Sequence, residues 1–419
     1  MNKVLCFIVF FCAVLFLSCN SKKESKDYDG RVLEAQTVEG VDMTFEIISV
    51  ADKTVQVGTG DNEKPAISKD YSGQITIPQE VQGYKVVRIG ANAFSNCNIT
   101  SAIIQEGVRI IEQYAFNGCN NLKKVKFPET LTAIETYAFV NTSLSVIHIP
   151  KSVSHIGNHA LRSACTTKIE VDVDNEYYDS RKDCNAIIET ASNILIVGCK
   201  NTKIPESVVE IGCGAFTFSE ELYEIEIPSN IKGIGEAAFS GCHNLYKVIL
   251  HNGLETIGER AFQGTGIASI HIPKTVKMIG ERFLMRTKIS HIVVESGNPK
   301  YDSRNECNAI IETTSNKLLV GCKNSVVPSS VQQIGESAFV YSDIERITLH
   351  ETISSIGIFA FAHCKNIQEV KSMIQDPFPV PSAFSLINEE ARLLVPRGSK
   401  EKYQQTKGWD KFKEIVEME

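Results

Sequence analysis

Two small clusters in the sequence have residue types and spacings that could support chemistry. His155 and His159 lie four residues apart in SHIGNHAL, and two imidazoles at this spacing are potential metal ligands. Glu224 and Glu226 alternate in LYEIEIP, so their carboxylates should point to one face. Neither cluster has further partners, because no glutamate completes an H-E-x-x-H arrangement and other copies of the repeat lack the paired glutamates. We therefore predict no metal, no cofactor and no catalytic residue.

Linear signatures of the common enzyme classes are also missing from the sequence. It contains no P-loop, no G-x-S-x-G elbow and no G-x-G-x-x-G turn after a long strand. A net charge of -7 and the lack of a basic stripe argue against nucleic acid as a partner. A dispersed catalytic triad leaves no linear pattern, so an uncharacterised hydrolase stays open as the second alternative.

The cysteines could form disulfides or remain as buried thiols. Ten cysteines follow Cys19, an even number, which allows a disulfide framework in an exported protein. Several of them occupy a repeated position where Ser, Thr and Ala also occur, and a free cysteine packs well as a small buried side chain. We expect mainly buried thiols. The pairs Cys184–Cys199 and Cys307–Cys322 are the first to test for a bond.

The N-terminal segment predicts export. MNKVLCFIVFFCAVLFLSCN has one lysine and then a short apolar run, the pattern of a secretion signal over residues 1–18. FLSC resembles the bacterial lipobox, which implies cleavage before Cys19 and its lipidation, although a plain secreted protein is the alternative. Residues 19–30 are polar and predict a flexible tether. The expected location is therefore the bacterial outer membrane, with lipid anchoring and surface exposure.

An internal repeat organises the rest of the chain. The phrase I-G-x-x-A-F recurs ten times in steps of 22 or 23 residues, interrupted by two steps of 55. A second phrase, L-x-x-I-x-I-P, alternates apolar and polar residues like a half-buried strand. Each unit predicts a strand, a turn and a short helical or 3₁₀ segment. One unit cannot bury a core alone, so about twelve coils should stack into a β-rich α/β solenoid with parallel strands on its concave face.

Each long step contains a nearly identical segment. YDSRKDCNAIIETASNILIVGCKN from Tyr178 and YDSRNECNAIIETTSNKLLVGCKN from Tyr301 share 19 of 24 positions and lie 123 residues apart. The same offset relates neighbouring copies of the I-G-x-x-A-F phrase, so we interpret this segment as a repeated shape and not a repeated active site. Within it, NAII and ILIV predict a small hairpin carried on a longer coil.

The ends of the solenoid are expected to carry caps, because an exposed terminal coil would offer its core and strand edge to other chains. VDMTFEIISVADKTVQVG, residues 41–58, predicts a β-hairpin in an N-terminal cap. A strand and a helix beginning near Ser399 predict the C-terminal cap, packed through Tyr403, Trp409, Phe412 and Val416. The expected divisions are the N-terminal cap over 31–85, the solenoid over 86–375 and the C-terminal cap over 376–419.

The two repeated phrases resemble the BspA-like leucine-rich repeats of bacterial surface proteins. The resemblance runs from about Val86 to Lys371, and the YDSR segment is similar to a long variant in that family. It implies a non-catalytic binding protein, used in adhesion or host contact, whose partner is a protein or glycan at the cell surface. The alternative is a structural or assembly lipoprotein that binds a partner of the same envelope.

The outward positions of the predicted strands form the candidate binding surface. They mix charges, hydroxyls and imidazoles and share no single chemistry, as expected for a contact surface that varies along a rigid sheet. We expect a monomer that contacts the membrane through its lipid anchor only. The candidate binding residues are Lys124, Lys126, His148, Glu224, Glu226, Lys247, His271, His291, Arg346 and Thr348.

Overall fold

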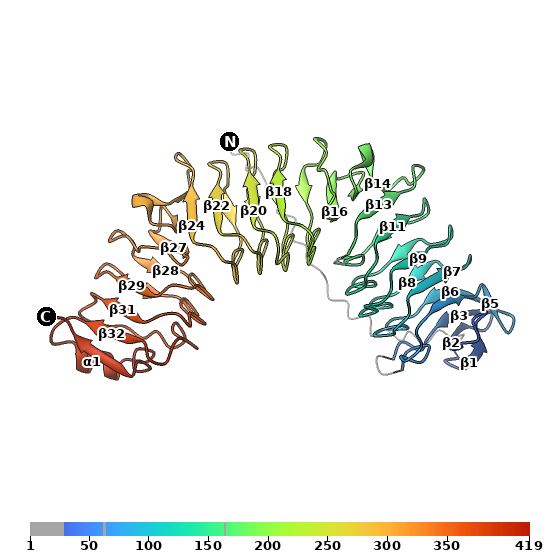
Figure 1. Cartoon of the computed structure of the whole chain (residues 1–419), viewed down its shortest axis with the longest axis horizontal. Helices are drawn as coiled ribbons and strands as arrows, with labels where there is room; N and C mark the ends of the chain where they lie inside the picture. Colours follow the sequence, from blue (N-terminus) through green and yellow to red (C-terminus); the bar gives the residue numbers. More distant parts are fainter. Residues whose placement is uncertain (1–28, 62–63, 163–164) are drawn as a thin grey trace, which may run out of the picture.

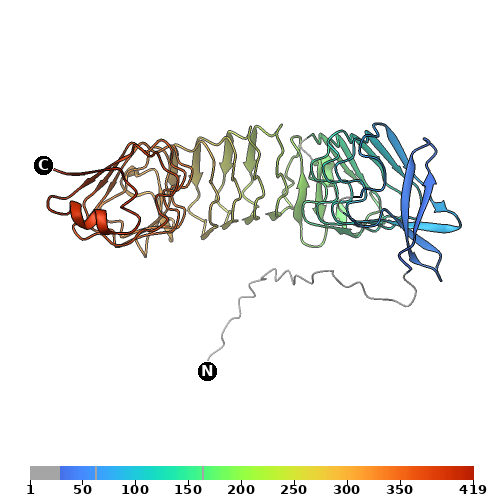
Figure 2. The ribbon, with the colours of Figure 1, turned by 90° about the horizontal axis from the view of Figure 1, so that it is seen from below.

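A computed structural model describes residues 29–61, 64–162 and 165–419. They form one long arch of stacked coils (Figure 1), and a view turned by 90° shows a single narrow band (Figure 2). The predicted solenoid is confirmed. The predicted signal, the lipidation residue Cys19 and most of the predicted tether lie outside the described residues. In the described part of the chain, no helix has the length and apolar character needed to cross a membrane.

One side of each regular coil is a strand of three or four residues. In the strand Val146–Ile149, Ile147 and Ile149 are buried, whereas Val146 and His148 are exposed. Neighbouring strands run parallel, with Ile147 opposite Ile169. We call this stack the long ladder. Its strands are β4 (Gln74–Ile77), β7 (Ser101–Ile104), β9 (Lys124–Lys126), β11 (Val146–Ile149), β13 (Lys168–Val171), β18 (Glu224–Ile227), β20 (Lys247–Leu250), β22 (Ser269–Ile272), β24 (His291–Val294), β29 (Arg346–Leu349), β31 (Glu369–Ser372), β32 (Arg392–Val395) and β33 (Glu414–Glu417).

A second side of each coil is a two-residue strand that ends on the isoleucine of the I-G-x-x-A-F phrase. Ile134 pairs in parallel with Ile111 on one side and Ile156 on the other. We call this stack the short ladder. Its strands are β8 (Ile110–Ile111), β10 (Ala133–Ile134), β12 (His155–Ile156), β17 (Glu210–Ile211), β19 (Gly233–Ile234), β21 (Thr256–Ile257), β23 (Met278–Ile279), β28 (Gln333–Ile334) and β30 (Ser355–Ile356).

The predicted helical segment after each short strand is wrong, because the chain forms consecutive turns there. The Ala115 N–H donates to the Glu112 carbonyl of its own turn at 3.1 Å, whereas the Phe116 N–H donates to the Ala138 carbonyl of the next coil at 2.8 Å. This alternation requires left-handed backbone at intervening positions, such as Tyr114 with φ of 60°. A helix would use these N–H groups internally. Here about half of them tie one coil to the next.

The phenylalanines of the repeated phrase form the centre of the core. Phe116 stacks between Phe94 and Phe139, with ring centroids 4.9 Å apart on both sides. Two further stacks follow along the chain, and the stacking stops at the two long steps, where Leu161 and Leu284 occupy the phenylalanine position. The other stacks are Phe216, Phe239 and Phe262, then Phe339, Phe361 and Phe384.

The repeated Cys, Ser or Thr position lies beside these rings, and its cysteine and threonine copies contact a backbone carbonyl. Cys119 Sγ lies 2.9 Å from the Phe94 carbonyl oxygen of the preceding coil. Thr142 Oγ1 donates instead to the Phe139 carbonyl of its own coil at 2.8 Å. The position therefore favours a small side chain that can donate a hydrogen bond.

Most of the predicted thiols are buried. Eight of the ten cysteines after Cys19 are buried, and no disulfide joins any of the ten in the described residues, including those of the pairs Cys184–Cys199 and Cys307–Cys322. Two differ from the prediction of burial, because Cys165 and Cys213 are exposed. Burial raises the pKa of the Cys242 thiol to about 12, which keeps it protonated and unreactive.

The two YDSR segments, which we call the first junction (residues 178–201) and the second junction (residues 301–324), contain the predicted hairpins. In the first, Ala186 lies opposite Gly198 in an antiparallel pair, and the second hairpin strand pairs in parallel with β17. Each hairpin therefore continues the short ladder. The junction elements are β14 (Tyr178–Asp179), η1 (Arg181–Asp183), β15 (Ala186–Glu189) and β16 (Ile194–Gly198), then β25 (Tyr301–Asp302), η2 (Arg304–Glu306), β26 (Ile310–Glu312) and β27 (Lys317–Val320).

The arginine of each YDSR phrase holds its hairpin in place. Arg181 Nε donates to Asp179 Oδ1 at 2.7 Å, and Arg181 Nη1 donates to Asn193 Oδ1 at 2.7 Å. In the second junction, Arg304 Nη1 donates to Asn316 Oδ1 at 2.8 Å. These contacts are structural, which supports the interpretation of a repeated shape.

The N-terminal end agrees with the predicted hairpin and adds to it. Strands β2 (Asp42–Ser49) and β3 (Thr54–Val57) pair antiparallel, β1 (Val32–Gln36) pairs with the free edge of β2, and β3 runs parallel to β6 (Tyr84–Ile89). A short strand, β5 (Glu80–Val81), pairs antiparallel with β6. The cap thus joins the short ladder through β6, which pairs with β8.

At the C-terminus the predicted strand and helix are present, but the helix is shorter than the predicted packing face requires. Helix α1 (Lys400–Gln405) ends before Gly408, whose φ of 99° turns the chain, and β33 then joins the long ladder beside β32. Tyr403, Trp409 and Phe412 are buried as predicted. Ile415 is buried in place of Val416, because residues alternate on a strand.

The number of coils is larger than the predicted twelve. The described residues contain about fifteen turns of solenoid. The additional coils carry β31, β32 and β33, which continue the parallel ladder to the C-terminus. They lack a complete I-G-x-x-A-F phrase, so counting that phrase missed them.

Candidate binding surface

The outward side chains of the long ladder form one face along the arch, which we call the long-ladder face. On β22, Ser269 and His271 are exposed, whereas Ile270 and Ile272 are buried. Paired strands lie about 4.8 Å apart, so equivalent outward residues form rows across the coils. The fold therefore turns an alternating sequence into an ordered surface.

All ten predicted binding residues lie on this face. Thr348 is half-buried and the other nine are exposed. Their part in binding stays a prediction. Lys124 and Lys126 are on β9, His148 on β11, Glu224 and Glu226 on β18, Lys247 on β20, His271 on β22, His291 on β24, and Arg346 and Thr348 on β29.

The structure brings together some of these residues and separates others. Lys247 Nζ lies 3.0 Å from Glu224 Oε2, and this hydrogen bond raises the pKa of Lys247. His271 and His291 come from the adjacent strands β22 and β24. Exposed ion pairs contribute little to stability, so these groups can exchange partners with a ligand at low cost.

Two exposed tyrosines beside this face were missed by the sequence reasoning. Tyr223 is 53% exposed and Tyr246 is 57% exposed. They occupy the same position in consecutive coils, and the Tyr246 N–H donates to the Tyr223 carbonyl at 2.9 Å. The signal was available, since an aromatic residue follows the first leucine in both LYEIEIP and LYKVIL. Tyrosine is enriched at protein interfaces.

The long-ladder face is hollowed on both sides of the first junction. The coil after β13 has no long strand, and the Ile169 N–H donates to Asn185 Oδ1 at 3.2 Å instead. A hollow of about 790 Å³ lies here, lined by residues that include His148, Lys168 and Glu170. A second hollow of about 280 Å³ includes Glu224 and Glu226 in its lining. Three predicted binding residues therefore border a break in the ladder.

One cleft occurs at each junction. There the hairpin lies between the I-G-x-x-A-F turn that precedes the junction and the one that follows it. The first cleft, about 260 Å³, is lined by residues of 156–162, Thr166, β16 and residues of 210–219. The second, about 120 Å³, is lined by residues of 279–285, 317–321 and 335–340. Most residues of the two linings correspond at an offset of 123. The 55-residue steps mark these two places in the sequence, because no I-G-x-x-A-F phrase, and so no turn of that kind, occurs within them.

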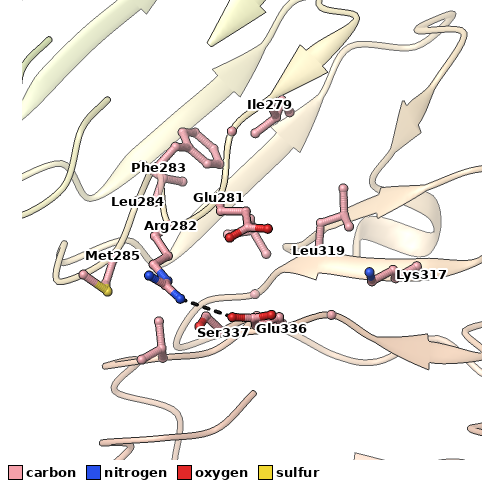
Figure 3. A pocket seen from close by; sticks show the side chains of 16 residues that line it. Ile279, Glu281, Arg282, Phe283, Leu284, Met285, Lys317, Leu319, Glu336 and Ser337 are labelled. Atoms are coloured by element: carbon pink, nitrogen blue, oxygen red, sulfur yellow. Dashed lines mark hydrogen bonds and ion pairs between the residues drawn. The ribbon is translucent and has the colours of Figure 1, made fainter. Parts of the chain in front are cut away.

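Figure 3 shows the second cleft, which contains an internal ion pair. Arg282 Nη2 lies 3.2 Å from Glu336 Oε1, so the acid from the turn after the junction neutralises the base from the turn before it.

In both clefts a glycine forms part of the wall. A Cβ at Gly321 would lie 2.0 Å from Phe339 Cε1, and one at Gly198 would lie 2.2 Å from Phe216 Cε1.

The histidine pair does not converge on one point. His155 is exposed and its Nε2 lies 3.6 Å from Glu135 Oε2. His159 stacks on the ring of Tyr137, with centroids 5.2 Å apart. Among the described residues, no group of three or more potential metal-binding side chains is assembled.

Comparison with known proteins identifies the repeat. The description BspA type leucine rich repeat region matches the chain in six copies, over residues 74–184, 196–305 and 309–377. No curated protein sequence matches significantly.

Solved structures of bacterial leucine-rich repeat proteins are similar to this chain. A leucine rich cell surface protein from Faecalibacterium prausnitzii is 20% identical, with a TM-score of 0.43, covering 92% of this chain and 95% of that one. A protein from Bacteroides ovatus is 18% identical, with a TM-score of 0.42 and coverage of 90% and 98%. One from Bacteroides capillosus is 30% identical, with a TM-score of 0.27 and coverage of 33% and 98%. Because the repeat match covers most of the residues, this chain belongs to the BspA-type leucine-rich repeat family.

Proposed function

We propose that this chain is a non-catalytic binding protein of the bacterial cell envelope, and that its long-ladder face contacts a protein or glycan partner in adhesion or host interaction. The observation that carries the proposal is the face itself. In the described residues, the thirteen strands of the long ladder present outward side chains, and the strands that pair do so in parallel within five short sheets. The ten candidate residues on seven of these strands mix both charges with imidazoles and a hydroxyl.

The centre of this face has the features of a contact surface. Tyr223 and Tyr246 offer two large exposed rings at one end of β18 and β20, and the charges of Glu224 and Lys247 lie directly beside them. An aromatic group flanked by polar residues combines contact area with hydrogen-bonding partners, a composition that is typical of the energetic centre of an interface.

The N-terminal sequence supports the proposed location. A secretion signal over residues 1–18 followed by a lipidated Cys19 would anchor the solenoid to the outer membrane, and the polar residues after it would hold the arch away from the bilayer. Protease treatment of intact cells should release the arch if it faces outward. A lipoprotein that serves assembly inside the envelope would be spared.

A binding screen tests the proposal directly. The mature chain, immobilised through its N-terminus, would be offered extracellular matrix proteins, a glycan array and the envelope fraction of the producing cell. For any partner captured, the double variant Tyr223→Ala/Tyr246→Ala should weaken binding about tenfold or more, the effect typical of central aromatic residues. The triple variant His271→Ala/His291→Ala/Arg346→Ala should weaken it as well.

A matched control uses exposed residues of the same coils outside the long-ladder face. Glu255 and Lys277 form an exposed ion pair beside the short ladder. The variant Glu255→Ala/Lys277→Ala should bind like the unchanged chain. Binding that survives both long-ladder variants but is lost in this control would overturn the assignment of the face. Turnover of a substrate by the unchanged chain would overturn the non-catalytic assignment.

A further inference from the structure

We propose that the first cleft is a binding site for a small oxyanion group, a carboxylate, sulfate or phosphate, held by the guanidinium of Arg162. This site lies apart from the long-ladder face, and the proposal does not depend on the function proposed for that face.

Arg162 is a half-buried cation without an acidic partner in the described residues. Its guanidinium carbon lies 3.7 Å from the centroid of the Phe218 ring. Its Nε is buried, and no described residue forms a hydrogen bond with it. Desolvation lowers its pKa, so burial opposes the charge. A guanidinium presents donors in a fork that matches an oxyanion, and such an anion would satisfy what the protein leaves unpaired.

A second unpaired group lines the same cleft. His159 Nδ1 is buried and has no hydrogen-bond partner within the part of the chain that the structure describes. The imidazole is fixed between the ring of Tyr137 and the backbone of Gly214, where a Cβ would lie 2.1 Å from His159 Cε1. Buried polar side-chain atoms are nearly always paired. Two unpaired nitrogens in one cavity, one of them on a cation, therefore point to a ligand.

In the second cleft, which has the same backbone framework, the partly buried cation is neutralised by an acid of the protein itself. At the offset of 123, Met285 replaces Arg162, Arg282 replaces His159 and Glu336 replaces Cys213. Arg282 pairs with Glu336 there. A cation also covers the equivalent aromatic ring in this block, but it is Arg286, whose Nη2 donates to Tyr341 Oη at 2.7 Å. Phe218 has no hydroxyl to offer Arg162.

Among the described residues that line the first cleft, the one acid does not neutralise Arg162. Glu210, on β17, has its pKa raised by desolvation, and no ion pair joins it to Arg162 or His159. The cleft volume of about 260 Å³ lies below the range of about 300 to 1,000 Å³ that is typical of drug-sized ligands. The site therefore suits an inorganic oxyanion or the charged end of a larger molecule.

Calorimetry with simple probes tests the site. The mature chain would be titrated with sodium phosphate, sodium sulfate and sodium glucuronate, with glucose as the neutral control. We expect at least one anion to bind and glucose not to bind, and the preferred anion identifies the source of the oxyanion. Arg162→Met places the second cleft's residue in the first and should weaken binding about tenfold to a hundredfold. Arg282→Met is the matched control and should leave binding unchanged.

Two further variants keep the proposal testable if Arg162→Met alters folding. Arg162→Lys keeps the charge but loses the fork, so it should bind more weakly than the unchanged chain and more strongly than Arg162→Met. Cys213→Glu adds the acid that the second cleft has, and it should compete with the anion. The proposal is overturned if no probe binds at about 10 mM, a concentration that detects even weak sites. It is equally overturned if Arg282→Met reduces binding as much as Arg162→Met.

Discussion

The first and second junctions share their framework, whereas the clefts beside them differ. Nineteen of 24 residues are identical, and even a strained position is kept, with φ of 55° at Lys182 and 56° at Asn305. The flanking turns differ in charge. The first cleft has an unpaired arginine and histidine, and the second has an ion pair. The junction segment therefore maintains the solenoid, and the side chains around it are free to specify different contacts.

The largest loss of unfolding free energy should come from disturbing the framework that the two junctions share, and it should be equal at both junctions. Gly198→Ala and Gly321→Ala each place a Cβ within about 2 Å of a phenylalanine ring carbon. Neither ring can move far, since Phe216 and Phe339 stack on the next coil. We expect each variant to lose about 3 kcal/mol of unfolding free energy, the upper end for an overpacked core. Urea denaturation followed by circular dichroism measures the loss.

A glycine in open space provides the control for these variants. Gly297 has φ of 87° and no atom within 4 Å of an added Cβ, so Gly297→Ala should cost only the backbone strain, about 1 kcal/mol. Equal losses for Gly198→Ala and Gly297→Ala would contradict the packing argument. A large loss at only one junction would contradict the shared framework.

A smaller effect should follow from removing the arginine that holds each hairpin. Arg181→Ala and Arg304→Ala each lose charge-assisted bonds to an aspartate and an asparagine. These groups are partly exposed, so we expect about 1 to 2 kcal/mol. Solenoids unfold in local steps. Hydrogen exchange in residues 186–198 or 309–320 should therefore rise about tenfold, and exchange in distant coils should not.

Acid should weaken the same bonds in both junctions together. Desolvation raises the pKa of Asp179, but hydrogen bonds from Arg181 outweigh it and the pKa is lowered overall; Asp302 behaves alike. The stabilisation is thus fully present above the ordinary pKa of aspartate and is lost as the pH falls through the lowered value. Lys277→Ala, which removes an exposed ion pair, is the control and should leave hairpin exchange unchanged. Hairpins that respond at different pH would contradict the equivalence.

The sequence predicted the strands and the hairpins well, because their signal is local. Alternation at Ile147 and Ile149, and the two apolar runs of CNAIIET and its partner, are enough to define a face or a hairpin. The turns after the short strands were mispredicted, because the Phe116 N–H finds its acceptor in the next coil, which no local pattern encodes. Each cleft is formed by side chains from two turns that lie 55 residues apart in the sequence. The position of Arg162 and His159 in one cavity could therefore be recognised only from the three-dimensional structure.

The clefts themselves predict stability changes of opposite sign. Arg162→Met removes a buried unpaired Nε, a cost of about 1 to 3 kcal/mol, and loses a cation–π contact of about 0.5 to 1 kcal/mol. We therefore expect a net gain of about 1 kcal/mol, the difference between the middles of these two ranges. Arg282→Met breaks a partly exposed ion pair and should lose about 0.5 kcal/mol. Thermal unfolding of the ligand-free chain compares the two, and a loss in both variants would contradict the view that Arg162 is retained for binding.

The two junctions should also differ in the reactivity of the cysteines beside them. This difference can be measured without a change in the stability of the protein. The two exposed cysteines, Cys165 and Cys213, both flank the first junction. Their equivalents at the second are Lys288 and Glu336. Buried Cys119 and Cys364 have pKa values raised to about 12, so almost none of these thiols is ionised at pH 8.

Among the ten cysteines after Cys19, a thiol reagent should therefore label only those beside the first junction in the folded protein. Iodoacetamide followed by peptide mass mapping should find two fast sites among these ten, at Cys165 and Cys213, and eight slow ones that react once urea unfolds the coils. Because Cys213 lines the first cleft, phosphate, sulfate or glucuronate bound beside Arg162 should slow its labelling and leave Cys165 as the internal control. Fast labelling at Cys307 or Cys322 would show instead that the second junction opens, and that the two frameworks are not equivalent in solution.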